Sequence, residues 1–219
     1  MLDSLEARQQ MVDTQLAPNA VTDKRLLGAM RTVPRETFLP PARLALAYSD
    51  AEHPLAAANG RVLPTPTAFA QLVQLGAIGP LDVVLDVGCG TGYSTAILAQ
   101  LASAVVAIED DQSLVARADE LLTKLEISNA AVLKADLSKG VPSEAPFDVI
   151  VIEGQVDDVP KALLTQLKDG GRLVTSVSHG KSGFARVFQK SGSDVTARES
   201  FNLNMPELAA FGAETAFAF

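Results

Sequence analysis

The chain has 219 residues, and 47% of them are hydrophobic, so it is long enough to bury a sizeable core. Its formal net charge of −8 comes without any basic cluster, which argues against nucleic acid and anionic membranes as partners. A single cysteine, Cys89, excludes an internal disulfide, and with His53 and His179 it has no usual zinc spacing, so we expect no metal.

The N-terminal third is predicted to be helical and then irregular. Apolar residues are spaced for a helix over residues 5–16, and Thr22 and Asp23 can cap a second helix that ends at Pro34. Residues 34–66 carry six prolines and little periodicity, which is typical of a long functional segment. The first residues are too charged for a signal peptide, and no stretch approaches the ~18 apolar residues of a membrane span, so we expect a cytoplasmic protein without a membrane partner.

From residue 83 onward, short apolar runs alternate with amphipathic helical stretches. This order predicts an α/β fold with a doubly wound, mostly parallel sheet. The expected strands are 83–87, 104–108, 130–133, 147–152 and 173–177, the expected helices are 93–101, 113–125 and 160–167, and a terminal antiparallel hairpin is expected over 184–190 and 194–201. The apolar C-terminus is then expected to return to the sheet edge. We expect one domain over 1–219, with an N-terminal elaboration over 1–78 and a ligand-binding core over 79–219.

A glycine-rich loop follows the first predicted strand, where an open α/β sheet binds its ligands. Its sequence is Asp86-Val87-Gly88-Cys89-Gly90-Thr91-Gly92-Tyr93. The three glycines let the backbone approach a ligand closely, and the next helix offers its free N–H groups. A dinucleotide loop would have glycine where Tyr93 stands, whereas this spacing is typical of class I methyltransferases, which bind S-adenosylmethionine. We therefore expect Gly88, Gly90, Gly92 and Tyr93 to contact this cofactor, and Cys89 to fill space only.

Acidic residues near the ends of the first three strands are the other candidate cofactor ligands. Glu109 lies 21 residues after the first glycine, where its carboxylate can accept both ribose hydroxyls, although it can also be a solvated strand end. Asp136 is placed to meet an adenine edge or to cap a turn. Asp86 can face the methionine amino group or support the loop. The neighbouring Asp110 and Leu137 complete the expected cofactor site.

Several longer blocks resemble the protein-L-isoaspartate O-methyltransferases over roughly residues 8–177. They are "QQMVDTQL", "AMRTVPRETFLP", "AYSDAEHPL", "VLDVGCGTGYSTAILAQL", "APFDVIVIE" and "LLTQLKDGGRLV". The first three are the specific part, because other methyltransferases share only the glycine loop. The resemblance implies methyl transfer from S-adenosylmethionine, leaving S-adenosylhomocysteine, to the side-chain carboxylate of isoaspartyl residues in aged proteins. It implies a repair enzyme, which we expect to be monomeric.

The differences from the family pattern lie where the acceptor is expected to bind. The family reads close to "GQTISQP" before the helix, where this chain reads "GRVLPTP", so Pro64 replaces the family serine and Thr65 carries the nearest hydroxyl. After the "FD" strand the family usually has Thr-Ala-Ala, where this chain has Glu153-Gly154-Gln155. A carboxylate acceptor needs no general base, so the lost serine weakens positioning only. The prolines should hold Thr65 in an extended segment across the glycine loop.

The candidate acceptor-site residues are Thr65, Tyr48, Asp50 and Glu153. Tyr48 and Asp50 match the family's "AY.D" block and either line the acceptor site or only pack in a turn. An unpaired Glu153 would repel a carboxylate acceptor and suit an amine or hydroxyl, unless it points away or pairs with Arg61. Two alternatives therefore stay open: a methyltransferase with another acceptor, and a non-catalytic S-adenosylmethionine-binding protein.

Two basic residues of the same region complete the set of candidates. His53 is expected to be an exposed loop residue and not a catalyst. Arg35 either binds a substrate carboxylate or forms an ion pair with Glu36 or Asp50.

Overall fold

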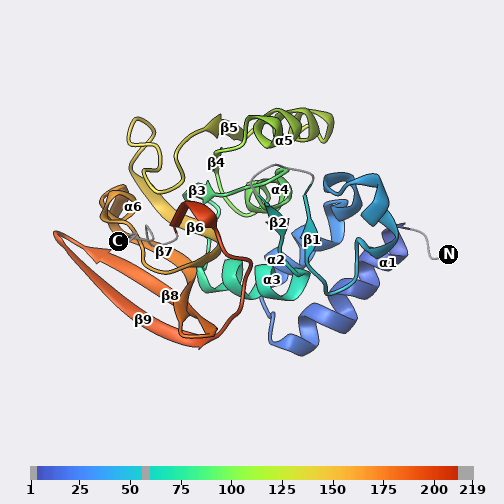
Figure 1. Cartoon of the computed structure of the whole chain (residues 1–219), viewed down its shortest axis with the longest axis horizontal. Coiled ribbons are helices and arrows are strands. Elements are labelled where there is room, and N and C mark those ends of the chain that lie inside the picture. The colour runs from blue at the N-terminus through green and yellow to red at the C-terminus, as the bar shows by residue number, and fades with distance from the viewer. Residues whose placement is uncertain (1–3, 56–59, 212–219) are drawn as a thin grey trace, which may run out of the picture.

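The computed structural model of the chain describes residues 4–55 and 60–211. Its centre is a seven-stranded sheet with the order β5-β4-β3-β6-β7-β8-β9 (Figure 1). The strands are β3 (Val83–Val87), β4 (Ala104–Glu109), β5 (Ala130–Lys134), β6 (Phe147–Val156), β7 (Leu167–His179), β8 (Ser182–Ser191) and β9 (Asp194–Asn202). The pairs from β5 to β7 are parallel, and β8 and β9 are antiparallel to their neighbours. The predicted doubly wound sheet with a terminal hairpin is confirmed.

Helices cover both faces of this sheet. They are α1 (Ser4–Met11), α2 (Lys24–Thr32), α3 (Pro66–Leu75), α4 (Tyr93–Ala99), α5 (Gln112–Lys124) and α6 (Lys161–Thr165), with short helical turns over 12–16, 17–19, 35–38, 41–46 and 209–211. Asp23 caps α2 as predicted, since its side chain accepts from the backbone N–H groups of Arg25 and Leu26. A two-stranded sheet joins β1 (His53–Pro54) to β2 (Val62–Leu63) just before α3. Among the described residues, no helix is long and apolar enough to cross a membrane.

Alternate residues of the central strands feed two hydrophobic cores. Val84 and Val149 point to the core shared with α2, α3, α4 and α5, whereas Leu85 and Ile150 point to the core shared with α6. Because both faces are covered, the parallel strands are continuous apolar runs, which is why their positions are readable from sequence. The N-terminal helices and the β8–β9 hairpin lie at opposite ends of the molecule (Figure 1).

The C-terminal segment does not return to the edge of the sheet, contrary to expectation. Pro206 and Leu208 instead bond to Gln155 near the end of β6, through Gln155 N to Pro206 O at 2.9 Å and Leu208 N to Gln155 O at 3.1 Å. Leu208 and Phe211 are buried against the α6 side of the sheet. The edge beside β7 is already occupied by the hairpin, so the apolar side chains of the segment find their partners over the sheet's middle. The residues after 211 lie outside the described part of the chain.

Candidate active site

The glycine loop adopts backbone angles that require glycine. Gly88, Gly90 and Gly92 have φ of +85°, +56° and +92°, a region that side-chain-bearing residues rarely adopt. A Cβ at Gly88 would lie 2.5 Å from Arg61 Nη2, and one at Gly90 would lie 2.8 Å from Leu55 Cδ1. The loop is held to β4, because the Gly88 N–H donates to Ile108 O at 2.9 Å. Arg61 and Leu55 thus pack closely against the glycine backbone, in space that a side chain at either glycine would fill.

Glu109 is the last residue of β4, and its side chain binds the backbone of the glycine loop. Its carboxylate is fully buried, and Oε2 accepts from Gly90 N at 2.9 Å and from Arg61 Nε at 3.1 Å, while Oε1 accepts from Asp110 N at 3.0 Å. Burial raises the pKa of Glu109, and the Arg61 guanidinium acts against this rise. Glu109 is therefore a positioned acceptor at the glycine loop and not a solvated strand end. Its contact with ribose stays a prediction.

Asp86 is a second fully buried carboxyl, one strand away. Its Oδ2 accepts from the hydroxyls of Ser94 and Thr95 at 2.8 and 2.7 Å, so it supports the first turn of α4. Its Oδ1 is buried and has no hydrogen-bond partner among the described residues. Burial raises the pKa of Asp86 to about 6. One oxygen of Asp86 therefore stabilises the first turn of α4, and the other can accept a hydrogen bond from a ligand.

Glu153 is the third buried carboxyl of the site. It is 4% exposed, and its Oε1 has no hydrogen-bond partner among the described residues. Burial and the charge of Asp86 raise its pKa well above the ordinary value, whereas the charge of Arg61 acts in the opposite direction. Glu153 therefore belongs to the same electrostatic group as Asp86 and does not point to solvent.

Arg61 is the buried charged residue of the site whose position the sequence did not predict. It is 8% exposed, it pairs with Glu109, and its Nη2 donates to the carbonyl of Gly88. The sequence offered Glu153 as a partner for Arg61, and the ion pair is formed with Glu109 instead. The available signal was a cation in the "GRVLPTP" segment, beside a loop that is rich in acidic residues.

Thr65 and Asp50 both act at the start of α3. Thr65 Oγ1 accepts from Ala68 N at 3.1 Å, and Asp50 Oδ1 accepts from Thr67 N at 3.0 Å. These bonds satisfy N–H groups that a helix start leaves without partners. The structural function of Thr65 is thus an N-cap. An acceptor-lining role for either residue stays a prediction.

Tyr48 lies in a cluster with N-terminal residues. Its hydroxyl accepts from Arg8 Nε at 3.1 Å and donates to the Glu36 carboxylate. Partial burial and the bond to Glu36 raise its pKa. The structure therefore gives Tyr48 a bridging position between α1 and the following turns, and its role in lining the acceptor site stays a prediction.

Arg35 is wholly buried and binds the backbone of the "GRVLPTP" segment. Its Nε donates to Ala47 O at 3.0 Å and its Nη2 to Pro64 O at 2.6 Å. Its guanidinium lies 4.9 Å from the centre of the Tyr93 ring, which also packs against two phenylalanines. The side chain of Tyr93 is thus in the core, so only its backbone, at the start of α4, faces the loop.

His53 is buried and not exposed, contrary to expectation. It is 1% exposed because β1 pairs with β2 and places His53 opposite Leu63. Burial and the charges of Arg35 and Arg43 lower its pKa, so it is neutral at pH 7.

The predicted adenine side of the site lies on the loops after β4 and β5. Leu137 is buried, whereas Asp110 is exposed. Asp136 forms a local turn: Oδ1 accepts from Ser138 N at 3.0 Å, and Oδ2 pairs with Lys139 at 2.8 Å. These partners lower the pKa of Asp136 to about 2. Its turn-capping function is visible here, and its contact with adenine stays a prediction.

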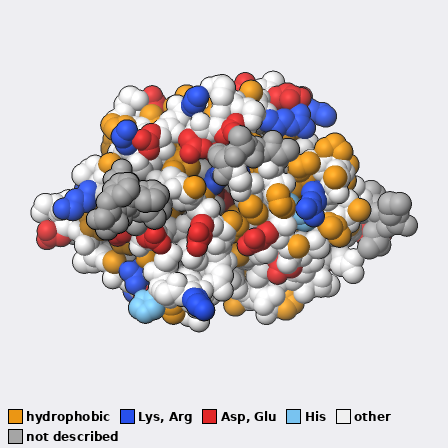
Figure 2. All heavy atoms as spheres, in the orientation of Figure 1, with side chains coloured by type: hydrophobic (Ala, Val, Ile, Leu, Met, Phe, Trp, Pro, Cys, Tyr) orange, Lys and Arg blue, Asp and Glu red, His pale blue; other side chains and the backbone are white. Residues whose placement is uncertain are grey.

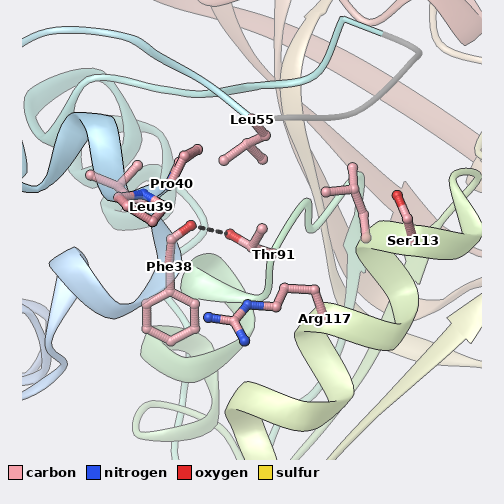
Figure 3. Close-up of a pocket in the computed structure, with 9 residues that line it drawn as sticks. Phe38, Leu39, Pro40, Leu55, Thr91, Ser113 and Arg117 are labelled. Carbon is pink, nitrogen blue, oxygen red and sulfur yellow. Dashed lines mark hydrogen bonds between the residues drawn. The ribbon is translucent and has the colours of Figure 1, made fainter.

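A pocket of about 350 Å³ opens on the outer side of the glycine loop (Figure 3). Its walls come from Phe38 to Pro41, from Leu55 and from the first turns of α5, with Arg117 extending along it. Thr91 Oγ1 donates to Phe38 O at 2.8 Å, which ties the N-terminal elaboration to the glycine loop. Leu55 lines this pocket and also packs closely against Gly90.

These residues fit S-adenosylmethionine. The glycine backbone can approach the ligand closely, Glu109 can accept from a sugar diol, and the orphaned oxygens of Asp86 and Glu153 suit a ligand with a cationic group. The cofactor, when bound, supplies an electrophilic methyl group. Within residues 4–55 and 60–211, no group of three or more His, Cys, Asp or Glu side chains is placed to hold a metal ion.

The sheet order and this site define a class I methyltransferase. The sequence profile of the family Protein-L-isoaspartate(D-aspartate) O-methyltransferase (PCMT) matches residues 6–203. The chain belongs to this family, and its cofactor is S-adenosylmethionine.

Curated relatives agree with this assignment. The Protein-L-isoaspartate O-methyltransferase of Koribacter versatilis is 42% identical over 170 residues, which cover 78% of this chain and 76% of the relative. The Protein-L-isoaspartate O-methyltransferase 1 of Syntrophobacter fumaroxidans is 40% identical over 177 residues, which cover 81% of this chain and 82% of the relative.

Solved structures show the same fold. One protein-L-isoaspartate O-methyltransferase has a TM-score of 0.82 at 25% identity, covering 94% of this chain and 67% of its own. A Plasmodium falciparum protein, described as a putative member in complex with S-adenosyl-L-homocysteine, has a TM-score of 0.77 at 18% identity, covering 93% and 98%.

Proposed function

We propose that the protein transfers the methyl group of S-adenosylmethionine to the side-chain carboxylate of isoaspartyl residues in aged proteins. The observation that carries this proposal is the family match over residues 6–203, which spans both the glycine loop and the acceptor segment. We extend the proposal to a monomeric, single-domain cytoplasmic enzyme without a nucleic-acid partner. On the face shown in Figure 2, Lys and Arg side chains lie in small separate groups among acidic ones. This distribution supports the proposed lack of a nucleic-acid partner.

Methyl transfer to a carboxylate requires few functional groups in the acceptor site. A side-chain carboxylate is ionised at pH 7, so it attacks the methyl carbon without a general base, and the protein must only align the two groups and exclude water. The oxygen–carbon bond forms as the carbon–sulfur bond breaks, and the electron pair of that bond stays on sulfur. The loss of the family serine at Pro64 therefore removes a positioning group and no chemical step.

Glu153 does not stand in the way of a carboxylate acceptor. Burial and the charge of Asp86 raise its pKa, which disfavours the charged form of this carboxyl in the unliganded protein. The electrostatic objection to an isoaspartyl carboxylate is thereby weakened.

The test is transfer of labelled methyl from S-adenosylmethionine to an isoaspartyl peptide, compared with the same peptide containing aspartate. We expect incorporation into the isoaspartyl peptide alone, and a higher rate after Pro64→Ser. Equal labelling of both peptides, or of neither, contradicts the proposal.

A second candidate is a methyltransferase of this scaffold with an amine or hydroxyl acceptor. The observation that favours it is the pair of departures at Pro64 and Glu153, because both change the acceptor side. It predicts no isoaspartyl methylation by the parent or by Pro64→Ser, and a gain only when Glu153→Thr is added.

A further inference from the structure

Three carboxyl side chains are buried around the glycine loop, and they differ in how their oxygens are partnered. Asp86 and Glu109 are 0% exposed and Glu153 is 4% exposed. Both oxygens of Glu109 accept hydrogen bonds, whereas Asp86 Oδ1 and Glu153 Oε1 have no partner among the described residues. A buried carboxyl oxygen without a donor is costly, so two neighbouring ones indicate a place for a ligand that donates.

The strand register sets the two orphaned carboxyls on neighbouring strands beside the loop. Val87 pairs with Ile152 in the parallel β3–β6 ladder, so Glu153 follows at the level of Gly88. Asp86 pairs with Val151, two residues before Glu153, so the two carboxyls belong to the same face of the sheet. A ligand bound on this face beside the glycine loop can meet both.

The nearby cation is engaged elsewhere. Arg61 contacts Glu109 and the Gly88 carbonyl, so its guanidinium is directed to the third carboxyl of the group. Three buried acids with one such arginine form a site that favours an incoming positive charge.

We propose that Glu153 determines cofactor specificity by binding, together with Asp86, the α-ammonium group of the methionine part of the cofactor. A primary ammonium has three N–H donors, and the two orphaned oxygens accept two of them as charge-assisted hydrogen bonds. The inference rests on the proposed function only through cofactor binding and not through the acceptor.

This role also explains why an acidic residue is compatible with a carboxylate acceptor. Once bound to the ammonium, the Glu153 carboxylate is partly neutralised, so it repels an acceptor carboxylate less than an unpaired one would. The threonine of the family pattern can offer a hydroxyl there, and cannot offer a charge.

The experiment combines a protein variant with a ligand variant. Calorimetry measures binding of S-adenosylhomocysteine and of its analogue without the α-amino group, to the parent and to Glu153→Gln. We expect Glu153→Gln to weaken S-adenosylhomocysteine binding about tenfold and to change binding of the analogue less than about twofold. Glu144→Gln, at an exposed loop position, is the matched control and should change neither.

Two results overturn the proposal: no change in either affinity, or equal weakening of both ligands, which would show a general role in shaping the site. The melting temperature of the unliganded protein is a second readout. It should hold or rise in Glu153→Gln and in Glu153→Thr, because both remove a buried carboxyl without a partner. Failure of both variants to fold would contradict the proposal. Since no peptide is present, a failed isoaspartyl assay leaves these outcomes unaffected.

Discussion

Arg61 binds the carboxylate that we assign to the cofactor ribose. Its Nε lies 3.1 Å from Glu109 Oε2, both side chains are buried, and a second guanidinium nitrogen contacts the Gly88 carbonyl. A ribose hydroxyl and Arg61 would use the same carboxylate as acceptor. We therefore expect the ion pair to compete with the cofactor for Glu109.

We expect Arg61→Gln to tighten S-adenosylhomocysteine binding by about three- to tenfold, because the competitor is removed. The unliganded variant should melt at a lower temperature, since loss of one partner leaves a buried carboxylate unpaired. Calorimetry and thermal unfolding measure both effects, with Arg31→Gln, from an exposed pair with Asp13, as the control. Weaker binding would show that Arg61 contacts the bound cofactor.

Glu109→Gln keeps the shape of the side chain and removes its charge. We expect S-adenosylhomocysteine binding to weaken by about 1 to 2 kcal/mol, or about 5- to 30-fold, through loss of charge-assisted bonds to the ribose. Asp136→Asn is the comparison, because Asp136 already has local partners in its turn. A tenfold loss in Asp136→Asn with no loss in Glu109→Gln would refute the ribose assignment.

Gly90→Ala and Gly170→Ala form a matched pair. Both glycines have positive φ, +56° and +76°, so each alanine costs about 1 to 2 kcal/mol of stability. A Cβ at Gly90 meets Leu55 at 2.8 Å, whereas one at Gly170 meets nothing within 4 Å. Only Gly90→Ala should abolish cofactor binding in calorimetry. Equal affinities of the two variants for the cofactor would show that the cofactor does not approach the backbone of Gly90 closely.

The pKa of Asp86 near 6 makes both stability and binding depend on pH. Burial is the main cause, and the charged or titratable groups around it are Arg61, Glu109, Glu153 and Cys89. A raised carboxyl pKa means that the folded protein holds the proton more tightly than the unfolded chain. This contribution to stability is therefore full below about pH 4 and is lost as pH rises to about 6.

Binding of the ammonium group has the opposite pH dependence, since it needs the carboxylate. We expect S-adenosylhomocysteine affinity to fall as pH drops through about 6, with protons released on binding near that pH. Calorimetry in buffers of different ionisation enthalpy counts these protons, and Asp86→Asn should reduce their number. Proton uptake, or an affinity that is flat from pH 5 to pH 7.5, would be inconsistent with this assignment.

Thr65 can act in two ways, and two substitutions separate them. As an N-cap its oxygen accepts from Ala68 N, which leaves the hydroxyl proton able to donate to an acceptor carboxylate. Thr65→Val should lower stability by about 1 kcal/mol, and Thr65→Asn should keep the cap. We expect both to lower isoaspartyl methylation about tenfold while cofactor affinity stays within about twofold. A parental rate in Thr65→Asn would make Thr65 a cap only.

The sequence predicts the sheet well and misses long-range contacts between side chains, for physical reasons. Val83–Val87 is a strand within its predicted bounds, because a strand covered on both faces is a nearly continuous apolar run, interrupted here by Asp86. Glu109 was found from its distance to the glycines, since the strand–helix–strand unit has a regular length. The pairing of Arg61 with Glu109 joins residues 48 apart across two loops, and no local pattern encodes it.

The strand β6 shows the same limit. Its expected end was residue 152, yet it continues to Val156 through a polar stretch. The extension pairs Gln155 and Val156 with β7, and Gln155 also bonds to Pro206 and Leu208, about fifty residues further along the chain. Likewise, the burial of His53 depends on its pairing with Leu63 and not on its own neighbours.

The bonds of Pro206 and Leu208 to Gln155 join β6 to a segment that is synthesised about fifty residues later. A Cβ at Gly154 would lie 2.5 Å from Leu208 Cγ, so the peptide beside Glu153 packs directly against this late segment. The ribosome completes β3, the glycine loop and β4 well before it adds residue 208. In a growing chain, the contact beside Glu153 can therefore form only after the segment around Leu208 has left the exit tunnel.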